Sequence, residues 1–407
     1  MKTAIVILNW NGRKFLEKYL PTLIGETPKE TKIVIADNGS EDGSIDWIEN
    51  TLIPKYKSNS KSDEQGYQTS DRESARIGHG IYNYSTKNDT YRFNIENLEI
   101  IKFNSNLGFT QGYNAALELI DTEYYVIMNS DIRIPEYSNM LPLTQGFKDN
   151  WLTPLIDFLD THPYAGICMP KIVSEIEYSN NSRQVFEYAG ASGGFIDRYG
   201  FPFCRGRILS SVENDTGQYN NPMQVFWASG ACMVIRSSLF KVLKGFDANF
   251  FAHMEEIDLC WRAKLLGWQV WAIPQSKVYH IGGGTLPNNS PRKLYLNYRN
   301  NLLMLYKNLP LKEESWEAFG IKGKYNRDTH IMIRMVIDGL SAVTYLLKGK
   351  FSYFKAVTRA HKDFRHMKKN MEFSPRIKEQ NLTGLYKGSI IKAFLLYVRR
   401  FSDLDLT

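Results

Sequence analysis

Short apolar runs alternate with amphipathic segments over the first third of the chain. Apolar runs rich in β-branched residues, as expected of strands buried on both faces, occupy residues 3–10, 31–37, 98–103 and 123–131. Apolar residues at helical spacing occupy residues 12–24, 44–53 and 112–120. Strand–helix alternation of this kind predicts an α/β fold with an open, mostly parallel central sheet flanked by helices.

The rest of the chain departs from this pattern in two places. Residues 54–94 are polar and rich in Ser, Asn, Asp, Lys and Tyr, so we expect a surface insertion or a mobile loop there. From residue 292 to the end, the pattern is helical and basic. We therefore predict an α/β domain over residues 1–291, which carries the insertion, and a mainly helical C-terminal extension over residues 292–407.

The net charge is divided unevenly between these two regions. The 407 residues carry +7 overall, with −6 on residues 1–291 and +13 on residues 292–407. A basic extension suits an anionic lipid surface or a nucleic acid, and a solvated helical surface explains it equally well. Its most apolar stretch, residues 331–347, is interrupted by Arg334 and Asp338, so we expect no membrane span.

Two parts of the extension have the pattern of basic amphipathic helices. In residues 340–369 and 389–401, apolar and aromatic residues alternate with Lys and Arg at helical spacing. Such helices can lie in the interface of an anionic membrane, pack on the α/β domain, or pair in a homodimer. The sequence leaves membrane contact and dimer packing open.

This chain lacks the sequence signatures of several enzyme classes. It has no GxxxxGK[ST] loop, no GxGxxG after the first strand and no GxSxG or HExxH segment, which removes the main support for P-loop kinases, NAD oxidoreductases and serine hydrolases. The four cysteines lie far apart without a CxxC pair. This pattern argues against a thiolate zinc site and fits free thiols in a reducing, cytoplasmic compartment.

All four predicted strands end in polar residues, at 9–11, 37–40, 104–108 and 129–131. Ligands of open α/β sheets bind at the carboxyl ends of the strands, so four polar ends predict one shared site. Asn129-Ser130-Asp131 offers a carboxylate that could bind Mg²⁺ or Mn²⁺ together with substrate phosphates. The same residue types also form turns, and the tripeptide alone does not decide between the two interpretations.

An acidic cluster begins the helix expected within residues 240–268. Glu255, Glu256 and Asp258 follow an aromatic pair, and a carboxylate beside an apolar wall can serve as a general base. One or two of these acids could instead act only as partners of the helix dipole.

A histidine and three glycines follow the last predicted strand. The glycines at 282–284 allow a ligand to approach the backbone closely, and the His280 imidazole could complete a metal shell begun by Asp131. A lone histidine is more often structural.

Seven segments in order along the chain resemble family 2 glycosyltransferases with the GT-A (Rossmann-like) fold, in particular the bacterial rhamnosyltransferase-like branch. They are VILNWNG (6–12), IADNGSEDGS (35–44), NSNLGFTQGYNAAL (104–117), VIMNSDI (126–132), ASGACMVIRSSLF (228–240), GFDANFFAHMEEIDLCWRAKLLGW (245–268) and VYHIGGGT (278–285). The resemblance covers about residues 3–291. It implies a GT-A catalytic domain, a nucleotide-sugar donor and a divalent cation, Mg²⁺ or Mn²⁺.

The resemblance also implies roles for individual residues. The residues implied to line the nucleotide and its sugar are Asn9, Asn11, Asp37, Asn38, Ser40, Asp42, Asn106, Gly108, Gly112 and Asn114. Among them, Asp37 is expected to accept a hydrogen bond from the nucleobase.

Asn129-Ser130-Asp131 takes the place of the family's DxD motif, with Asn at the first acidic position. This implies that Asp131 is the direct metal ligand, that Asn129 and Ser130 contact the donor, and that His280 is a second metal ligand.

The family's catalytic base falls on Glu256, where the family more often has Asp, and Glu255 remains the alternative. Asp258 and Arg262 are expected either to orient the helix or to touch the donor diphosphate or the acceptor. The residues expected on the acceptor side are Trp227, Ser229 and Gly230.

The implied activity is a metal-dependent, inverting transfer of a sugar from dTDP-rhamnose or a UDP-sugar. The acceptor would be a hydroxyl of a glycan or lipid-linked oligosaccharide in the synthesis of a bacterial surface polysaccharide, in the cytoplasm or on the inner face of the cell membrane. Two rival classes are a non-catalytic sugar-binding module on the same fold and a nucleic-acid-binding protein built around the basic extension. The presence of Asp131, Glu256 and His280 argues against the first, and the acidic front region against the second.

Overall fold

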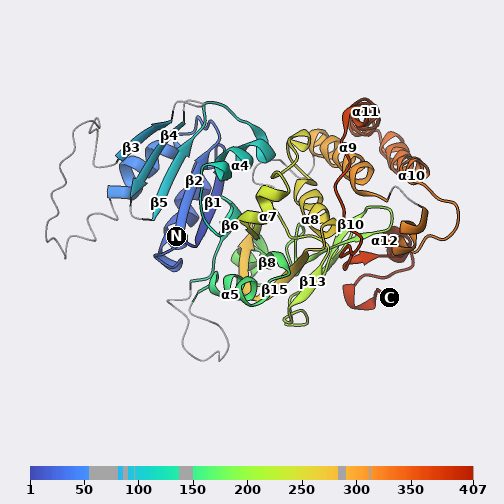
Figure 1. Cartoon of the computed structure of the whole chain (residues 1–407), viewed down its shortest axis with the longest axis horizontal. Coiled ribbons are helices and arrows are strands. Elements are labelled where there is room, and N and C mark those ends of the chain that lie inside the picture. The colour runs from blue at the N-terminus through green and yellow to red at the C-terminus, as the bar shows by residue number, and fades with distance from the viewer. Residues whose placement is uncertain are drawn as a thin grey trace.

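The computed structural model describes residues 1–54, 81–85, 90–95, 97–136, 150–282, 290–310 and 313–406. A central sheet runs through the molecule, with β3–β5 at one end and α9–α12 at the other (Figure 1). Gly283 and Gly284, which the sequence places beside His280, lie outside the described residues.

The core of the central sheet is formed by four parallel strands in the order β6-β1-β2-β5. They are β6 (Tyr124–Asn129), β1 (Thr3–Asn9), β2 (Lys32–Asp37) and β5 (Leu98–Lys102). Asn9 pairs with Asp37, and Leu8 pairs with Asn129. This register brings the polar ends of three strands to the same edge of the sheet.

Strands beyond this core make the sheet mixed. On the β6 side follow β14 (Cys232–Arg236), β8 (Ala165–Ser174), β15 (Gln269–His280) and β13 (Met223–Val225), and β7 (Ile132–Arg133) pairs with β15. The β14 pairs are antiparallel, and β15 is parallel to β8. The predicted α/β class is confirmed, with a parallel core and antiparallel strands outside it.

Helices connect the core strands, as the alternating pattern predicts. These are α1 (Arg13–Glu26), α2 (Ser44–Trp47), which continues as one π-helical turn (Ile48–Leu52), and α4 (Gly108–Glu118). The strand residues between them are almost wholly buried, from Ala4–Ile7 in β1 to Ile33–Ala36 in β2. A sheet covered on both faces needs such continuous apolar runs, which is why the sequence pattern finds these strands well. The remaining helices of this half are α5 (Thr153–Thr161), α6 (Glu175–Asn181) and α7 (Ser237–Val242).

Two strands lie within the predicted polar insertion. β3 (Ile81–Ser85) and β4 (Thr90–Ile95) form an antiparallel pair that extends the sheet beyond β5. Residues 55–80 and 86–89 of this segment lie outside the described residues.

A second sheet, which the sequence pattern does not reveal, has the strand order β12-β11-β10-β9-β16. Its strands are β9 (Gly194–Asp197), β10 (Pro202–Cys204), β11 (Arg207–Ile208), β12 (Ser211–Val212) and β16 (Leu385–Tyr386). β16 comes from the C-terminal extension and pairs in parallel with β9. The extension therefore supplies a strand to this sheet, and the boundary near residue 291 stays a prediction.

Four helices dominate the C-terminal extension, as the sequence predicts. They are α9 (Pro291–Asn308), α10 (Arg327–Leu347), α11 (Phe351–Met367) and α12 (Ile390–Leu395). α9 begins at a good N-terminal signal, because the Ser290 side chain accepts a hydrogen bond from Lys293 N at 3.1 Å and Pro291 follows directly. α9 packs on both α8 (Glu255–Leu265) and α11, and α11 packs on α10.

In the described part of the chain, α10 alone is long and apolar enough to cross a membrane. Length and composition are weak evidence, because core helices of soluble proteins meet the same two conditions. Arg334 and Asp338 on this helix form a buried ion pair, with Nε and Oδ1 2.9 Å apart.

A buried lysine on α8 yields a prediction about stability. Lys264 is fully buried, and its Nζ has no hydrogen-bond partner among the described residues. Burial lowers the pKa of Lys264 to about 7. The unfolded chain therefore binds an extra proton between about pH 7 and the ordinary lysine value, and stability should rise with pH over that range.

Replacing Lys264 by Met should raise the free energy of unfolding at pH 6 by about 1–4 kcal/mol, because the substitution removes a buried charge and keeps the volume. Denaturant unfolding at pH 6 and pH 9 would measure this, with the exposed Lys241→Met as the control. An equal gain at both pH values would contradict the assigned cause.

Candidate active site

The ends of β1 and β2 are joined by a buried polar contact. Asn9 Nδ2 donates to Asp37 Oδ1 at 3.0 Å and lies 3.1 Å from Ser40 Oγ. Asp37 also accepts a hydrogen bond from Ser40 N at 3.1 Å, and both Asn9 and Asp37 are fully buried. The structure therefore brings together three of the residues predicted to bind the donor.

Asn11 and Asp42 hold the loops that follow these strands. Asn11 has a positive φ of 50°, and its side-chain oxygen accepts a hydrogen bond from Glu41 N at 2.9 Å. Asp42 accepts from Arg13 N at 2.8 Å and also from Ser44. Burial alone would raise the pKa of Asp42, but its hydrogen bonds, that from Ser44 foremost, lower it overall. Asn11 remains exposed at the mouth of this edge.

A second link joins β2 to the start of α4. Asn38 Nδ2 donates to Asn106 Oδ1 at 3.1 Å and to Gly108 O at 3.2 Å, while Asn38 Oδ1 accepts from Leu107 N at 2.9 Å. Gly108 has φ 78°, and a β-carbon there would lie 2.5 Å from the Phe251 ring. A β-carbon at Gly112 would likewise lie 2.9 Å from the Leu8 side chain and 3.2 Å from Asn38 Nδ2. Both positions require glycine for backbone packing.

The ends of β1 and β6 approach each other through Gly12. A β-carbon at Gly12 would lie 2.5 Å from Asn9 Oδ1 and 3.1 Å from Ser130 Oγ. Asn129 N donates to Ala231 O at 2.9 Å. Ser130 therefore lies beside the Asn9 cluster, and Asn129 lies beside residues 229–231.

Asp131 and His280 meet as the sequence predicts, and Glu187 joins them. His280 Nε2 lies 3.2 Å from Asp131 Oδ1, and His280 Nδ1 lies 3.5 Å from Glu187 Oε1. All three side chains are buried. Burial lowers the pKa of His280, but the Asp131 and Glu187 carboxylates outweigh it and raise the pKa to about 10. The sequence offers no motif that singles out Glu187.

Glu255 and Glu256 begin α8 with the properties of acids in an apolar environment. Burial raises the pKa of Glu255 well above its usual value, and the neighbouring Glu256 carboxylate raises it further. Burial likewise raises the pKa of Glu256 to about 7. One oxygen of each carboxylate has no hydrogen-bond partner among the described residues. Glu256 is the more accessible of the two, so it is better placed to meet a substrate hydroxyl.

Residues 229–231 contact Ala189, Glu256 and Asn129. Ser229 Oγ donates to Ala189 O at 2.5 Å, two residues from Glu187. A β-carbon at Gly230 would lie 3.5 Å from both the Glu256 Cβ and the Phe109 ring. Ala231 O binds the backbone of Asn129. Glu256 therefore lies beside residue 230, while Asn129 and Ala189, each two residues from a member of the Asp131–His280–Glu187 cluster, bond to residues 231 and 229.

Several predicted site residues instead have their polar groups occupied by protein. The Asn114 side chain donates to Phe246 O at 2.8 Å and accepts from Phe246 N at 2.9 Å. Trp227 is buried and donates its indole N–H to Phe195 O at 2.8 Å. These contacts account for both residues without a ligand.

Asp258 and Arg262 orient α8, which is the first of the two roles that the sequence left open. Arg262 Nε binds Asp258 Oδ2 at 2.7 Å, and its other two nitrogens donate to Leu243 O and Gly245 O. Lys307 Nζ, 3.0 Å from Asp258 Oδ2, ties α9 to the same carboxylate. Burial raises the pKa of Asp258, but Lys307 and Arg262 together lower it overall.

A strained loop precedes α8, and side chains of α9 form hydrogen bonds to its backbone. Phe251, His253 and Met254 have φ values of 64°, 71° and 71°, a region that costs non-glycine residues free energy. Asn300 Nδ2 donates to Phe250 O at 2.9 Å, Ala252 O at 2.8 Å and His253 O at 2.7 Å. The sequence gives no signal for this role of Asn300.

Replacing Asn300 by Ala should lower the transfer rate constant by about 10²-fold and leave KM for the donor nearly unchanged. The loop would lose three hydrogen bonds from the Asn300 amide, and a displacement of about 1 Å at the base is enough for such a loss. Steady-state kinetics would measure kcat and KM separately.

Asn301→Ala is the matched control. It removes the same amide from the next residue, where Nδ2 donates to Gly200 O at 2.7 Å in another loop and makes a long contact of 3.9 Å with Met254 Sδ. Both variants should lose stability to a similar extent, but only Asn300→Ala should lose kcat. Equal kinetic losses would contradict the positioning role.

The donor set fits a cation that is shared with substrate. Among the described residues, no group of three or more His, Cys, Asp or Glu side chains is arranged to hold a metal ion. Asp131 and His280 nevertheless present one carboxylate and one imidazole side by side. Mg²⁺ and Mn²⁺ commonly take only one or two protein ligands and complete their shells with phosphate oxygens and water.

The chain is similar to bacterial rhamnosyltransferases over part of its length, although no family model matches it. It is 38% identical over 182 residues to rhamnosyltransferase WbbL of Escherichia coli K12, which covers 42% of this chain and 60% of that protein. It is 26% identical over 113 residues to the N-acetylglucosaminyl-diphospho-decaprenol L-rhamnosyltransferase of Mycobacterium tuberculosis, which covers 27% of this chain and 36% of that protein. The matches span about a third to three fifths of these relatives. These matches confirm that the chain resembles rhamnosyltransferases over part of its length.

Two solved structures align with most of this chain at low sequence identity. Residues 1–349 of Staphylococcus aureus TarS have 14% identity and a TM-score of 0.42, and the alignment covers 90% of this chain and 92% of that one. A mannosyltransferase from Pyrobaculum calidifontis, in complex with GDP-Man and Mn²⁺, has 11% identity and a TM-score of 0.43, with 97% of this chain and 78% of that one covered.

Proposed function

We propose that this protein is an inverting, divalent-metal-dependent glycosyltransferase. It would transfer a sugar from a nucleoside-diphosphate donor, dTDP-rhamnose or a UDP-sugar, to a hydroxyl of a lipid-linked oligosaccharide or growing glycan. The observation that carries the proposal is the buried Asp131–His280 pair, which follows strand β6 where Asn129 N bonds to Ala231 O, next to Gly230 and Glu256. The names of the relatives, both rhamnosyltransferases and one acting on a diphospho-decaprenol acceptor, support the substrate classes.

The residues at the ends of β1 and β2 would bind the nucleoside. Asp37 and Asn9 form a buried, hydrogen-bonded pair that can present a carboxylate oxygen to a base N–H without moving. Asn11 and Ser40 lie at the open side of the same cluster, where a ribose would fit. Gly108 and Gly112 border this cluster, and the lack of a side chain at each lets Phe251, Leu8 and Asn38 pack closely there.

Glu256 would act as the general base. It removes the proton from the acceptor hydroxyl while that oxygen forms a bond to the anomeric carbon of the sugar. The bond from this carbon to the phosphate oxygen breaks, and the nucleoside diphosphate leaves with the electron pair. Attack on the face opposite the leaving group inverts the anomeric configuration.

Asp131 and His280 would hold a divalent cation, Mg²⁺ or Mn²⁺. When bound, the cation supplies Lewis-acid stabilisation of the charge on the leaving diphosphate. Glu187, whose Oε1 lies 3.5 Å from His280 Nδ1, would help to orient the imidazole so that Nε2 faces Asp131.

The test is nucleotide release from a panel of UDP-, dTDP- and GDP-sugars in the presence of detergent-solubilised lipid-linked acceptors. The assay is run with Mg²⁺, Mn²⁺ or EDTA, and donor binding is measured in parallel by calorimetry. The proposal expects metal-dependent release of one nucleoside diphosphate. Donor binding without release would identify a missing acceptor, and the absence of binding to any donor would overturn the proposal.

A further inference from the structure

A basic groove lies between α9 and α11. It encloses about 660 Å³, and its lining includes four cationic side chains, those of Arg292, Arg299, Lys355 and Arg359. No acidic residue lines it among the described residues. We call this the α9–α11 groove. A concave surface with several cations and no anion is suited to a multiply charged anionic ligand.

Aromatic side chains hold part of this charge in place. Two guanidinium groups lie near the Tyr295 ring, with Arg299 Cζ at 5.3 Å and Arg359 Cζ at 5.1 Å from its centroid. Arg292 Cζ lies 5.5 Å from the centroid of the Phe251 ring. Asp363 is an acid beside this group: it accepts a hydrogen bond from the Tyr295 hydroxyl at 2.6 Å and lies 3.5 Å from Arg359 Nε. One carboxylate at the edge leaves most of the positive charge uncompensated.

The groove adjoins the proposed transfer site through Phe251. This residue lines the groove, packs its ring against Gly108, and accepts hydrogen bonds from Phe109 N at 2.9 Å and Thr110 N at 3.2 Å. Phe109 in turn approaches Gly230, next to Glu256. A ligand whose anionic group binds in the groove could therefore extend past Phe251 toward the base, Glu256.

An exposed apolar stripe ends beside the groove. On α10, Met332, Val336, Leu340, Val343 and Leu347 follow one another at helical spacing and are 47–82% exposed. Phe351, at the start of α11, is 62% exposed and precedes Ser352, which lines the groove. An exposed apolar row of this length beside a basic groove matches a surface that meets lipid.

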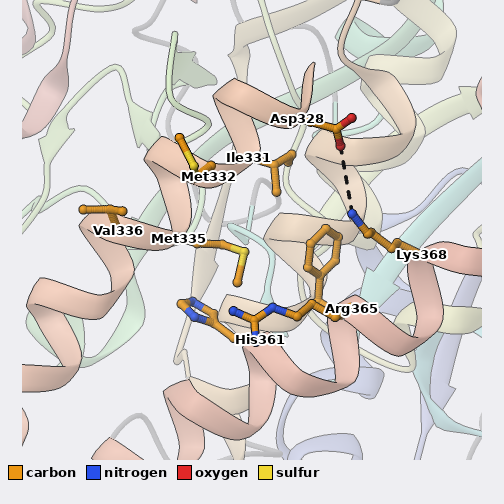
Figure 2. A pocket seen from close by; sticks show the side chains of 9 residues that line it. Asp328, Ile331, Met332, Met335, Val336, His361, Arg365 and Lys368 are labelled. Atoms are coloured by element: carbon orange, nitrogen blue, oxygen red, sulfur yellow. Dashed lines mark ion pairs between the residues drawn. The ribbon is translucent and has the colours of Figure 1, made fainter. Parts of the chain in front are cut away.

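A second hollow, between α10 and α11, offers a contrast. We call it the α10–α11 groove. It is lined by Met332, Met335 and Val336 from α10 and by His361, Arg365 and Lys368 from α11 (Figure 2). Asp328 also lines it and lies 3.9 Å from Lys368 Nζ. This hollow has an acid of its own, and Phe251 is not part of its lining.

We propose that the α9–α11 groove binds the diphosphate of the lipid-linked acceptor, whose lipid chain then leaves along the apolar stripe of α10. The proposal rests on the proposed glycosyltransferase function. Arginine and lysine side chains bind phosphate oxygens by charge-assisted hydrogen bonds, and a diphosphate presents enough oxygens for three or four of them. The sugar attached to this diphosphate would point past Phe251 toward Glu256.

The direct test is calorimetric titration of the full-length protein with geranyl diphosphate, a short and soluble prenyl diphosphate. Arg292→Gln and Lys355→Gln should each weaken binding about tenfold, as expected for the loss of one charge-assisted contact. Arg365→Gln, which removes the same charge from α11 in the α10–α11 groove, is the control and should change the affinity less than about twofold. Equal losses in all three variants, or no loss in the groove variants, would overturn the proposal.

Two further ligands distinguish other sources of phosphate. Titration with UDP or dTDP in the presence of Mn²⁺ should be the same for wild type and groove variants, and a loss there would assign the groove to the donor instead. Binding to phosphatidylcholine vesicles with and without phosphatidylglycerol should likewise be unaffected by Lys355→Gln. Loss of vesicle binding with geranyl diphosphate binding retained would assign the groove to phospholipid head groups and overturn the proposal.

A transfer assay completes the design. With a lipid-diphosphate acceptor, the groove variants should raise the acceptor KM about tenfold, and with a phosphate-free alkyl glycoside they should not. The same increase with both acceptors would contradict a diphosphate site. If wild type binds no nucleotide-sugar, the proposed function fails, and the geranyl diphosphate titration still decides whether the groove binds a diphosphate.

Discussion

The Glu256→Gln variant is expected to transfer sugar about 10³-fold more slowly than the wild type while it binds the donor with unchanged affinity. A general base contributes on the order of 10²–10⁴-fold to a rate, and the amide cannot accept the proton. Donor affinity should persist because the nucleoside cluster around Asn9 and Asp37 lies on β1 and β2, whereas Glu256 lies on α8. Single-turnover transfer and calorimetric donor titration would measure the two quantities.

Glu255→Gln is the control for this experiment, because it makes the same change one residue away. Glu255 is more deeply buried than Glu256, so it is less accessible to a substrate hydroxyl, and both burial and the Glu256 carboxylate raise its pKa. Glu255→Gln should therefore lower the transfer rate much less than Glu256→Gln does. If Glu255→Gln loses activity and Glu256→Gln retains it, the assignment of the base is reversed.

The pH dependence follows from the same environment. Burial raises the pKa of Glu256 to about 7, and a base must be ionised to accept a proton. kcat/KM should therefore fall as the pH drops below about 7, rather than near the usual glutamate value. A profile that stays flat down to pH 5 would contradict Glu256 as the base.

The Asp131→Asn variant should bind Mn²⁺ more than about 100-fold more weakly in the presence of a nucleoside diphosphate, and its transfer rate should fall about 10³-fold. The substitution removes the carboxylate that lies 3.2 Å from His280 Nε2, and altering even an outer partner of a metal site costs 10–100-fold in affinity. Electron paramagnetic resonance of free Mn²⁺ would measure binding independently of activity.

Asp160→Asn serves as its control. Asp160 accepts a hydrogen bond from the Tyr124 hydroxyl at 2.7 Å, at the opposite end of the same strand β6. It should bind Mn²⁺ as the wild type does. Unchanged Mn²⁺ affinity in Asp131→Asn would show that this carboxylate is not a metal ligand.

The order of core strands and helices could be predicted because local patterns report local burial. β1, β2, β5 and β6 are buried on both faces, and continuous apolar runs mark them within a few residues of their observed bounds. The second sheet could not be found in this way. Its strands are two to four residues long, too short for any period to appear, and β16 pairs with a strand almost 190 residues away.

The polar strand ends were visible in the sequence, but their convergence depends on register. Pairing of Asn9 with Asp37 brings these residues to one edge, and a shift by one residue would turn the side chains to the other face. In the same way, the acidic cluster at residues 255–258 was evident, while its division into an accessible Glu256 and a salt-bridged Asp258 was not. That division comes from Lys307 and Asn308 on α9, some 50 residues later.

The sequence by itself determined the α/β class, the main strand ends, Asp131, His280 and Glu256 as candidates, and the resemblance to rhamnosyltransferase-like enzymes. Only the tertiary structure revealed three further groups. These are Glu187 beside His280, Asn300 bonded to the strained loop, and the four cations of the α9–α11 groove. The reason is physical. Periodicity and motifs record interactions between near neighbours in the chain, whereas these contacts join residues that folding brings together across tens of intervening positions.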